Sequence, residues 1–264
     1  MQAENSNPVV LCFGGLDPSG GAGLQADIEA IAACGGHALP IATCLTVQNS
    51  AQAFKFSPTE SQLIAQQAES LLQDININGC KIGVIPNGEI ATVISGIIRQ
   101  IPNIPVVLDP VFRASRGSTF CDQATINTIS EMLLPLTSIA TPNVAELVAL
   151  TSESEPLTAR ATELCMLGSD YVLLTDADNP APKVRNKLFN AQGLIKEYYW
   201  PKLPHAYHGS GCTLSSALAC FLSMKTEVSI ATNLAQEYTW HSLQNAQALG
   251  TGQRIPKRIN VHAD

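Results

Sequence analysis

The sequence has no pair of cysteines in the CxxC spacing, although eight cysteines are spread along its 264 residues. The five histidines do not fall at ligand spacing near these cysteines, so a zinc site is disfavoured together with a disulfide framework. Most of the cysteines stand inside apolar segments. We therefore interpret them as small buried side chains of a protein in a reducing compartment.

Positive charge is also scarce, because 15 lysines and arginines face 22 aspartates and glutamates and the formal net charge is −7. This balance argues against a broad basic surface for nucleic acid or anionic lipid. The N-terminal MQAENSNP lacks the basic and apolar regions of a signal peptide, and no apolar run reaches the length that spans a bilayer. We expect a cytoplasmic protein without nucleic-acid or membrane partners, and small-molecule chemistry becomes the leading class of function.

Apolar, β-branched runs alternate with segments of helical periodicity along most of the chain. PVVLCFGG (8–15) and CKIGVIP (80–86) are typical of buried strands, whereas GAGLQADIEAIAACGG (21–36) is typical of a helix that ends at glycine. Such alternation predicts an α/β fold whose mostly parallel sheet is flanked by helices on both faces. No repeat or linker interrupts the pattern, so we expect a single domain over residues 1–264, with a flexible N-terminus at residues 1–7.

The limits of some elements depend on short patterns. SPTESQLIAQQAESLLQD (57–74) predicts a helix that begins at Ser57 or Ser61, and KLFNAQ (187–192) with LIKEYYWPKL (194–203) predicts a pair of strands. In parallel α/β sheets, ligands bind at the carboxyl ends of the strands. We therefore expect the functional site in the loops that follow the strands.

A glycine-rich loop, GGLDPSGGAGLQAD (14–27), contains GAGLQA, which fits the relaxed dinucleotide pattern G-x-G-x-x-A. A DPSG turn separates these glycines from the strand, and the next strand ends in TVQN (46–49) without the acid that binds ribose, so dinucleotide binding is disfavoured. No lysine follows the glycines, which excludes a P-loop. The loop keeps two interpretations: its backbone contacts a small ligand near Asp27, or it is a tight turn before an exposed helix acid.

The segment HGSGC (208–212) places two glycines at the start of a helix. Backbone N–H groups at such a start lack helical partners, and the helix dipole adds positive charge, so the segment predicts an anion hole for a phosphate. The same environment lowers the pKa of a cysteine, so Cys212 is expected to hold a thiolate near neutral pH. From the residues alone, the alternative is that Cys212 is a small buried helix residue.

Six blocks of the sequence occur in the order found in one enzyme family: GGLDPSGGAGLQAD, TVQN, KIGV, VVLDPV, TPNVAE and HGSGCTLSSALA. On these blocks, which extend over most of the chain, the sequence resembles the hydroxymethylpyrimidine and phosphomethylpyrimidine kinases of thiamine biosynthesis, in the ribokinase-like superfamily. The resemblance implies a three-layer α/β/α fold with a central, mostly parallel sheet, and often a homodimer. It also implies an enzyme that uses ATP and Mg²⁺ to phosphorylate 4-amino-5-hydroxymethyl-2-methylpyrimidine and then its monophosphate. Whether a monovalent cation is needed stays open.

The resemblance implies roles for individual residues at the acceptor. Gly15, Asp27 and Gln48 are expected to line the pyrimidine pocket, since an amide both donates to and accepts from an aminopyrimidine edge. Val84 and Val111 are expected to form its apolar walls.

Further roles concern the transferred phosphoryl group. The resemblance implies that Cys212 stands where other ribokinase-like enzymes carry an aspartate base, and that Gly209, Ser210 and Gly211 complete the anion hole with it. Phosphoryl transfer needs positioning and charge neutralisation more than covalent catalysis, so these groups suit the reaction.

The nucleotide and metal roles fall on a second motif. Asn143 and Glu146 match N-x-x-E, which implies that Glu146 lies near Mg²⁺ and phosphate, directly or indirectly. From the residues alone, Glu146 is equally a solvated acid in the first turn of a helix.

The chain departs from the family pattern between residues 175 and 187. Many relatives carry a lysine and paired glycines there, whereas this chain has VLLTDADNPAPKVRN. We expect Thr175 to donate a hydroxyl to the nucleotide, and Lys183, Arg185 or Lys187 to lend positive charge from a loop. His208 is interpreted as structural.

Two other functions compete with this one. A pyridoxal or pyridoxine kinase of the same fold is compatible with the DPSGGAG loop. A catalytically silent pyrimidine-binding module is suggested by the altered 175–187 segment, although a pure sensor needs neither the GSGC block nor the N-x-x-E block.

Overall fold

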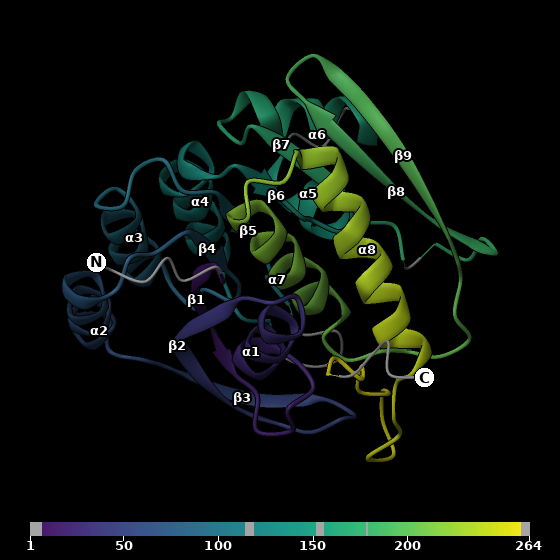
Figure 1. The fold of residues 1–264 in the computed structure, drawn as a ribbon, viewed down its shortest axis with the longest axis horizontal. Coiled ribbons are helices and arrows are strands. Elements are labelled where there is room, and N and C mark those ends of the chain that lie inside the picture. The colour runs from purple at the N-terminus through teal and green to yellow at the C-terminus, as the bar shows by residue number, and fades with distance from the viewer. Residues whose placement is uncertain (1–6, 114–118, 152–155, 178, 260–264) are drawn as a thin grey trace.

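The computed structural model describes four stretches of the chain, residues 7–113, 119–151, 156–177 and 179–259. Of the N-terminal segment expected to be flexible, residues 1–7, only Asn7 lies inside these stretches. Figure 1 shows a central sheet between two layers of helices. The predicted three-layer α/β/α fold with a mostly parallel sheet is confirmed.

Nine strands of the described residues form one sheet in the order β3-β2-β1-β4-β5-β6-β7-β8-β9. The strands from β2 to β7 pair in parallel, whereas β3 is antiparallel to β2 and β8 is antiparallel to both of its neighbours. The strands are β1 (Val9–Leu16), β2 (His37–Gln48), β3 (Ala53–Pro58), β4 (Gly79–Ile82), β5 (Val106–Leu108), β6 (Ile139–Ala140), β7 (Tyr171–Leu174), β8 (Lys183–Asn190) and β9 (Gly193–Pro201).

The helices of the described residues divide between the two faces of the sheet. Helices α1, α7 and α8 cover one face, and α2 to α6 cover the other. None of them is long and apolar enough to cross a membrane. They are α1 (Gly23–Ala33), α2 (Ser61–Asp74), α3 (Gly88–Ile98), α4 (Gln123–Met132), α5 (Val144–Leu150), α6 (Leu157–Met166), α7 (Ser210–Ser223) and α8 (Val228–Gln244), with a short 3-10 turn η1 (Leu134–Leu136).

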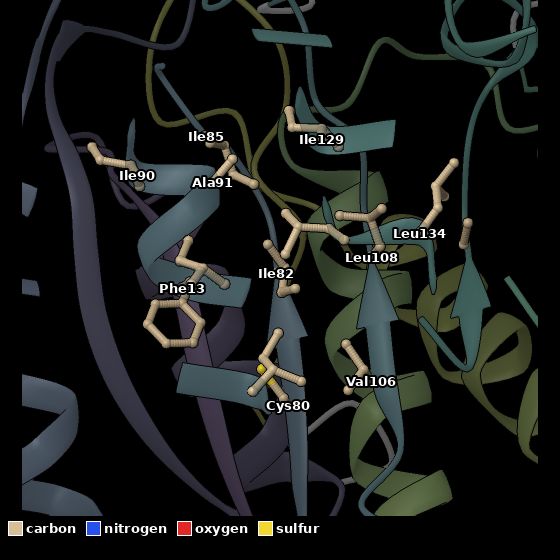
Figure 2. Packing of buried hydrophobic residues seen from close by; sticks show 14 of the residues in the cluster. Phe13, Cys80, Ile82, Ile85, Ile90, Ala91, Val106, Leu108, Ile129 and Leu134 are labelled. Carbon is tan, nitrogen blue, oxygen red and sulfur yellow. The ribbon is translucent and has the colours of Figure 1, made fainter. Parts of the chain in front are cut away.

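Successive side chains of a strand point to opposite faces of the sheet, and the buried strands are apolar throughout, so both faces of the sheet are apolar. In β1, Val9, Leu11 and Phe13 pack on the face of α2 to α6, whereas Val10 and Cys12 pack on the face of α1, α7 and α8. Figure 2 shows the first of these layers, in which Phe13 lies with apolar side chains of β4, β5 and α3 in one cluster. The sheet is therefore buried on both sides, and its polar chemistry gathers at the strand ends.

Two elements differ from their predicted limits. Strand β3, which was not predicted, occupies residues 53–58, so α2 begins at Ser61, the later of its two predicted starts. Strand β8 begins at Lys183, four residues before the predicted 187, because its antiparallel pairing with β9 extends to Lys183 opposite Pro201. A short edge strand and a register set by a distant partner leave little trace in a local pattern.

Candidate active site

A cavity of about 490 Å³ opens at the carboxyl ends of the parallel strands, next to the start of α7. This is the place that the parallel sheet predicts for a ligand. Apart from Asp27 and the cations Lys183, Arg185 and Lys187, every residue that the sequence assigned to the site lines this one cavity: Gly15, Gln48, Val84, Val111, Asn143, Glu146, Thr175, Gly209, Ser210, Gly211 and Cys212.

One part of the cavity, here called the β2 end, is lined by Gly15, Gln48 and Val84. The register of β1 against β2 shifts between Gly14 and Gly15, so the chain kinks where it meets the cavity. A Cβ atom on Gly23 would lie 2.1 Å from the carbonyl oxygen of Gly15, which explains why glycine is needed for this close approach. The Val84 carbonyl accepts a hydrogen bond of 2.6 Å from Thr43.

Asp27 does not line the cavity, which corrects the expectation that it forms part of the pocket wall. Its side chain is fully buried, and one carboxylate oxygen accepts from Lys81 Nζ at 2.9 Å and from Ser216 Oγ at 2.7 Å. Burial opposes the charged form of Lys81, but Asp27 holds the pKa of this lysine above its ordinary value. The pair lies beneath the cavity, to which Lys81 itself contributes.

The start of α7 faces the cavity through Gly209, Ser210, Gly211 and Cys212. Gly209 adopts a left-handed conformation with φ of 78°, and a Cβ there would lie 2.1 Å from the Gly21 carbonyl oxygen, so both the angle and the space require glycine. Among the described residues no side chain caps this helix, and its first intrahelical bond comes from Thr213 N to Gly209 O at 3.0 Å. The N–H groups before Thr213 are thus available to an anion.

The predicted lowering of the Cys212 pKa is wrong. Burial raises the pKa of this thiol to about 12, and the negative charges of Asp109 and Asp27 add to the rise, although Lys81 and the Gly23 backbone act against it. Desolvation outweighs the helix dipole because burial of the thiol disfavours its charged form. Cys212 is therefore a neutral thiol at physiological pH.

Asp109, within the VVLDPV block, lines the cavity but was not among the predicted site residues. It follows β5, is 4% exposed and accepts from Ser215 Oγ at 3.1 Å. A Cβ built on Gly211 would lie 3.8 Å from both of its carboxylate oxygens, so Asp109 stands directly under the start of α7. Burial raises its pKa, while the positive charge of Lys81 lowers it. An acid after a strand and a lone lysine inside the apolar CKIGV run were the signals in the sequence.

Asp17 and His208 join the first glycine-rich loop to α7. His208 Nε2 lies 2.8 Å from Asp17 Oδ2, and Asp17 also accepts from the backbone N–H groups of Ser19 at 2.8 Å and Ala22 at 2.9 Å. Burial alone raises the pKa of Asp17, but the hydrogen bonds from His208 and Ser19 outweigh it and lower the value to about 2. The structural interpretation of His208 is consistent with this contact.

Asn143 and Glu146 form a capping box at the start of α5. The Glu146 N–H donates to Asn143 Oδ1, and the Asn143 N–H donates to Glu146 Oε2, each at 2.9 Å. Thr175, which follows β7, donates to the Pro142 carbonyl through its N–H at 2.9 Å and through Oγ1 at 3.3 Å. These contacts fix three of the predicted side chains at the middle of the cavity, with one Glu146 oxygen used by the cap.

The other part of the cavity, here called the β8 end, is lined by Val184 and Asn186 of β8, by Trp200 of β9 and by Gln236 and Trp240 of α8. Gln236 Oε1 accepts from Asn186 Nδ2 at 2.9 Å and from Trp200 Nε1 at 3.1 Å. The two tryptophan rings lie 6.4 Å apart between centroids and tilt by 30°. The aromatic wall was missed because β8, β9 and α8 come together only in the folded chain.

The cations expected to serve this end point away from it. Lys183, Arg185 and Lys187 are on strand β8, not in a loop, and they alternate with Val184 and Asn186, which line the cavity. Successive side chains of a strand face opposite sides, so the three cations lie on the outer face, where Arg185 pairs with Glu197. The expectation that one of them lends charge to the site is wrong.

Within the described residues, no group of three or more histidine, cysteine, aspartate or glutamate side chains is placed to hold a metal ion. In phosphoryl-transfer sites, Mg²⁺ is held by one or two carboxylates together with phosphate oxygens and waters. Asp109 and Glu146 both line the cavity and supply carboxylate oxygens. The residues present therefore fit a magnesium ion that arrives with a nucleotide better than a site made of protein alone.

A model of the family described as phosphomethylpyrimidine kinase matches residues 17–257. A hydroxymethylpyrimidine/phosphomethylpyrimidine kinase of Salmonella typhimurium is 31% identical over 265 residues, which cover 96% of this chain and 97% of the relative. The multifunctional protein ThiED of Corynebacterium efficiens is 29% identical, and there the matched region spans only 34% of the relative. In the bifunctional ThiED of Geobacter sulfurreducens, which is 30% identical, it spans 50%.

Two solved structures share the arrangement of the chain. The phosphomethylpyrimidine kinase of Clostridium difficile superposes with a TM-score of 0.75 at 26% identity, covering 88% of this chain and 97% of the other. An ADP complex of a pyridoxal kinase from Bacillus subtilis superposes with a TM-score of 0.86 at 24% identity, covering 96% and 97%. At that identity the second likeness concerns the fold.

Proposed function

Because the chain belongs to the phosphomethylpyrimidine kinase family, we propose that it transfers a phosphoryl group from ATP to 4-amino-5-hydroxymethyl-2-methylpyrimidine and then to the monophosphate so formed. The observation that carries this proposal is the uncapped start of α7, which opens into the middle of a cavity with two chemically different ends. Backbone N–H groups aimed at one point stabilise the charge of a phosphoryl group in transit without reorganisation. This reaction belongs to thiamine biosynthesis, which is therefore the pathway proposed for the protein.

The β2 end is proposed to hold the pyrimidine. Gln48 offers an amide to the aminopyrimidine edge, Gly15 lets the backbone approach the ring, and Val84 and Val111 supply apolar contact. Asp27 acts on this end from below, through its ion pair with Lys81.

The β8 end is proposed to hold the nucleotide, with its base against Trp200 and Trp240 and its phosphates toward Thr175 and the start of α7. Aromatic faces bind any base by stacking. A magnesium ion bound with ATP would be held by Asp109 and Glu146 and would neutralise phosphate charge. Whether turnover requires a monovalent cation is measured in the ADP-release assay.

Cys212 is proposed to accept the proton of the substrate hydroxyl in the first phosphorylation. Its pKa of about 12 means that the thiolate fraction rises tenfold for each pH unit throughout the working range. The rate constant kcat/KM for the alcohol should therefore rise with pH between about 7 and 9, since this constant reports the free enzyme. In Cys212→Asp the carboxylate is already ionised at pH 7, so the same profile should become flat.

The decisive experiment is ADP release with Mg-ATP and the pyrimidine alcohol. We expect turnover by the wild type and a fall in the first-step kcat of ~10²–10⁴-fold in Cys212→Ala, the usual size of general-base catalysis. The second step is an internal control, because its acceptor is already a phosphate anion and should lose less. A first-step kcat within about threefold of wild type would remove Cys212 from the proton-transfer role.

The same assay separates the competing functions. A strong preference for pyridoxal over the pyrimidine alcohol would replace the proposed substrate with the ring that the pyridoxal kinases of this fold use. Tight pyrimidine binding without ADP release, measured by calorimetry, would replace the kinase with a silent binding module.

We further propose that residues 1–264 form a single kinase domain that acts in the cytoplasm as a homodimer. The exposed apolar side chains of Leu45, Val47 and Phe54, on the β2–β3 edge of the sheet, support self-association. Sedimentation of the wild type should give twice the mass of the 264-residue chain, and Val47→Lys should shift it to the monomer. A monomeric wild type would refute the dimer.

A further inference from the structure

Arg258 lies beyond every motif that the chain shares with its family, and one residue beyond the matched region 17–257. It is nevertheless only 1% exposed and is the largest fully buried side chain of the described residues. A buried guanidinium is costly unless its donors are paired. The donors of Arg258 are therefore expected to have partners within the fold.

The guanidinium of Arg258 contacts three separate parts of the chain. Its Nε donates to Thr213 Oγ1 at 2.8 Å, in the first turn of α7. Its Nη1 donates to the Gly20 carbonyl at 3.3 Å and pairs with Glu29 of α1 at 3.2 Å, and its Nη2 donates to the Gly21 carbonyl. One side chain thus joins the glycine-rich loop and α1 to the start of α7.

The contact with Thr213 fixes the orientation of the anion hole. Thr213 accepts from Arg258 and donates in turn through Oγ1 to the Gly209 carbonyl at 2.8 Å. The peptide between Gly209 and Ser210 is planar, so a carbonyl held toward the helix turns the Ser210 N–H toward the cavity. The Gly209 carbonyl also accepts from the Thr213 N–H at 3.0 Å, so Arg258 reinforces the orientation of this donor by fixing the hydroxyl that makes the second bond.

The contacts with Gly20 and Gly21 fix the opposite wall. Gly21 has no room for a side chain, because a Cβ there would lie 2.1 Å from His208 Cδ2. On the other side, its carbonyl accepts from Arg258, so the loop is held between His208 and the guanidinium. The next N–H, of Ala22, donates to Asp17 at 2.9 Å.

We propose that Arg258 is a positioning residue for phosphoryl transfer, which holds the start of α7 and the loop 17–22 at the separation that the transferred group requires. The inference rests on the proposed kinase function and adds the C-terminal segment after α8 to the machinery of the site. Errors of about 1 Å in such positioning cost ~10²-fold in rate. The side chain itself touches no reacting atom.

The first test is Arg258→Lys, which keeps the charge and loses the fork of donors. We expect the first-step kcat to fall by about 10–100-fold. The KM for the pyrimidine alcohol should stay within about threefold, because Gly15, Gln48 and Val84 are held by strand pairing and by Thr43, not by Arg258. A residue that only stabilises the fold would lower the melting temperature and leave kcat unchanged.

The second test is chemical rescue of Arg258→Ala. Guanidinium chloride at low millimolar concentration should restore part of the lost kcat, whereas sodium chloride of equal ionic strength should not. Arg254→Lys is the matched control. It lies four residues earlier, its Nη1 donates to the Ala246 carbonyl at 3.5 Å, and it should keep wild-type kcat.

The outcomes separate cleanly. The proposal is overturned if folded Arg258→Lys keeps kcat within threefold of wild type, or if folded Arg258→Ala is slow and guanidinium does not restore it. If Arg258→Ala does not fold, the lysine variant decides alone. A wild type without ADP release on the alcohol overturns the proposed function instead, and is recognised before any variant is measured.

Discussion

The β2 end and the β8 end belong to one cavity but differ in where their charged side chains lie. Beneath the β2 end, Asp27 and Lys81 are fully buried and paired at 2.9 Å. At the β8 end, the wall is aromatic and amide, and the cations Lys183, Arg185 and Lys187 lie on the far side of the strand. Removing one member of a buried ion pair lowers the stability of the fold strongly, whereas replacing a residue of the aromatic wall or an exposed cation lowers it much less.

The difference shows where specificity and tolerance should lie. The polar groups under the β2 end have fixed partners, so a ligand there must match donors and acceptors that cannot move. At the β8 end, the side-chain carbonyl of Gln236 already accepts hydrogen bonds from Asn186 and Trp200. Stacking is therefore the main contact left for a base.

Lys81→Met should lower the free energy of unfolding by about 3–5 kcal/mol, because it leaves the Asp27 carboxylate buried without its cation. Urea denaturation at pH 7 measures the change. Lys55→Met, at an exposed position of β3, is the matched control and should change stability by less than ~0.5 kcal/mol. A loss below ~1 kcal/mol for Lys81→Met would contradict the description of a charge that depends on its partner.

Asp17 should make stability sensitive to acid. Its pKa in the folded protein is about 2, below the ordinary 3.8, so its contribution is fully present above pH ~4 and is lost as pH falls through the folded value. Between pH 5 and pH 2, this group should account for ~2 kcal/mol of lost stability. Asp17→Asn should remove that part of the pH dependence in urea titrations. Equal slopes below pH 4 in both proteins would show that the contacts with His208 and Ser19 do not stabilise the charge.

Trp240→Leu should raise the KM for ATP about tenfold, because stacking against one base contributes ~1–3 kcal/mol. The KM for the pyrimidine alcohol should not change, since the two ends are lined by different strands. Tyr199→Leu removes an aromatic ring from β9 that is 54% exposed and serves as the control. A rise in the alcohol KM alone would exchange the roles of the two ends.

Replacing Lys183, Arg185 or Lys187 by alanine should have the smallest effect, less than ~0.5 kcal/mol in ATP binding, as expected of surface charges. Steady-state KM for ATP is the measurement. Lys202→Ala provides the comparison, because Lys202 lines the cavity and its KM for ATP should rise more than that of any of the three. A larger effect from Arg185 would mean that the outer face of β8 takes part in binding.

The sequence predicted the parts of the site whose geometry is local. A helix start such as Gly209 to Cys212, or a capping pair such as Asn143 and Glu146, is built within four residues, so its pattern can be read directly. The alternation of buried runs likewise predicted the layers and the place of the cavity.

The rest depends on residues that meet across long separations. Lys81 lies 54 residues from Asp27, and the Cys212 pKa is set by the burial that such meetings produce. Which side chains of β8 face the cavity depends on the pairing of β8 with β9. That pairing begins at Lys183, whereas the short sequence pattern predicted a strand beginning only at residue 187. Local propensity carries no information on these contacts.

The buried carboxylate of Asp27 also has a consequence for synthesis. Its partners Lys81 and Ser216 stand 54 and 189 residues later in the chain. Ribosomes add about 5–20 residues per second, so Ser216 emerges roughly 10–40 s after Asp27. Until α7 is made, the half-finished chain can close its centre only by enclosing a carboxylate that lacks one of its two donors. The centre of the sheet should therefore stay hydrated during most of translation and close as a late, nearly whole-chain event.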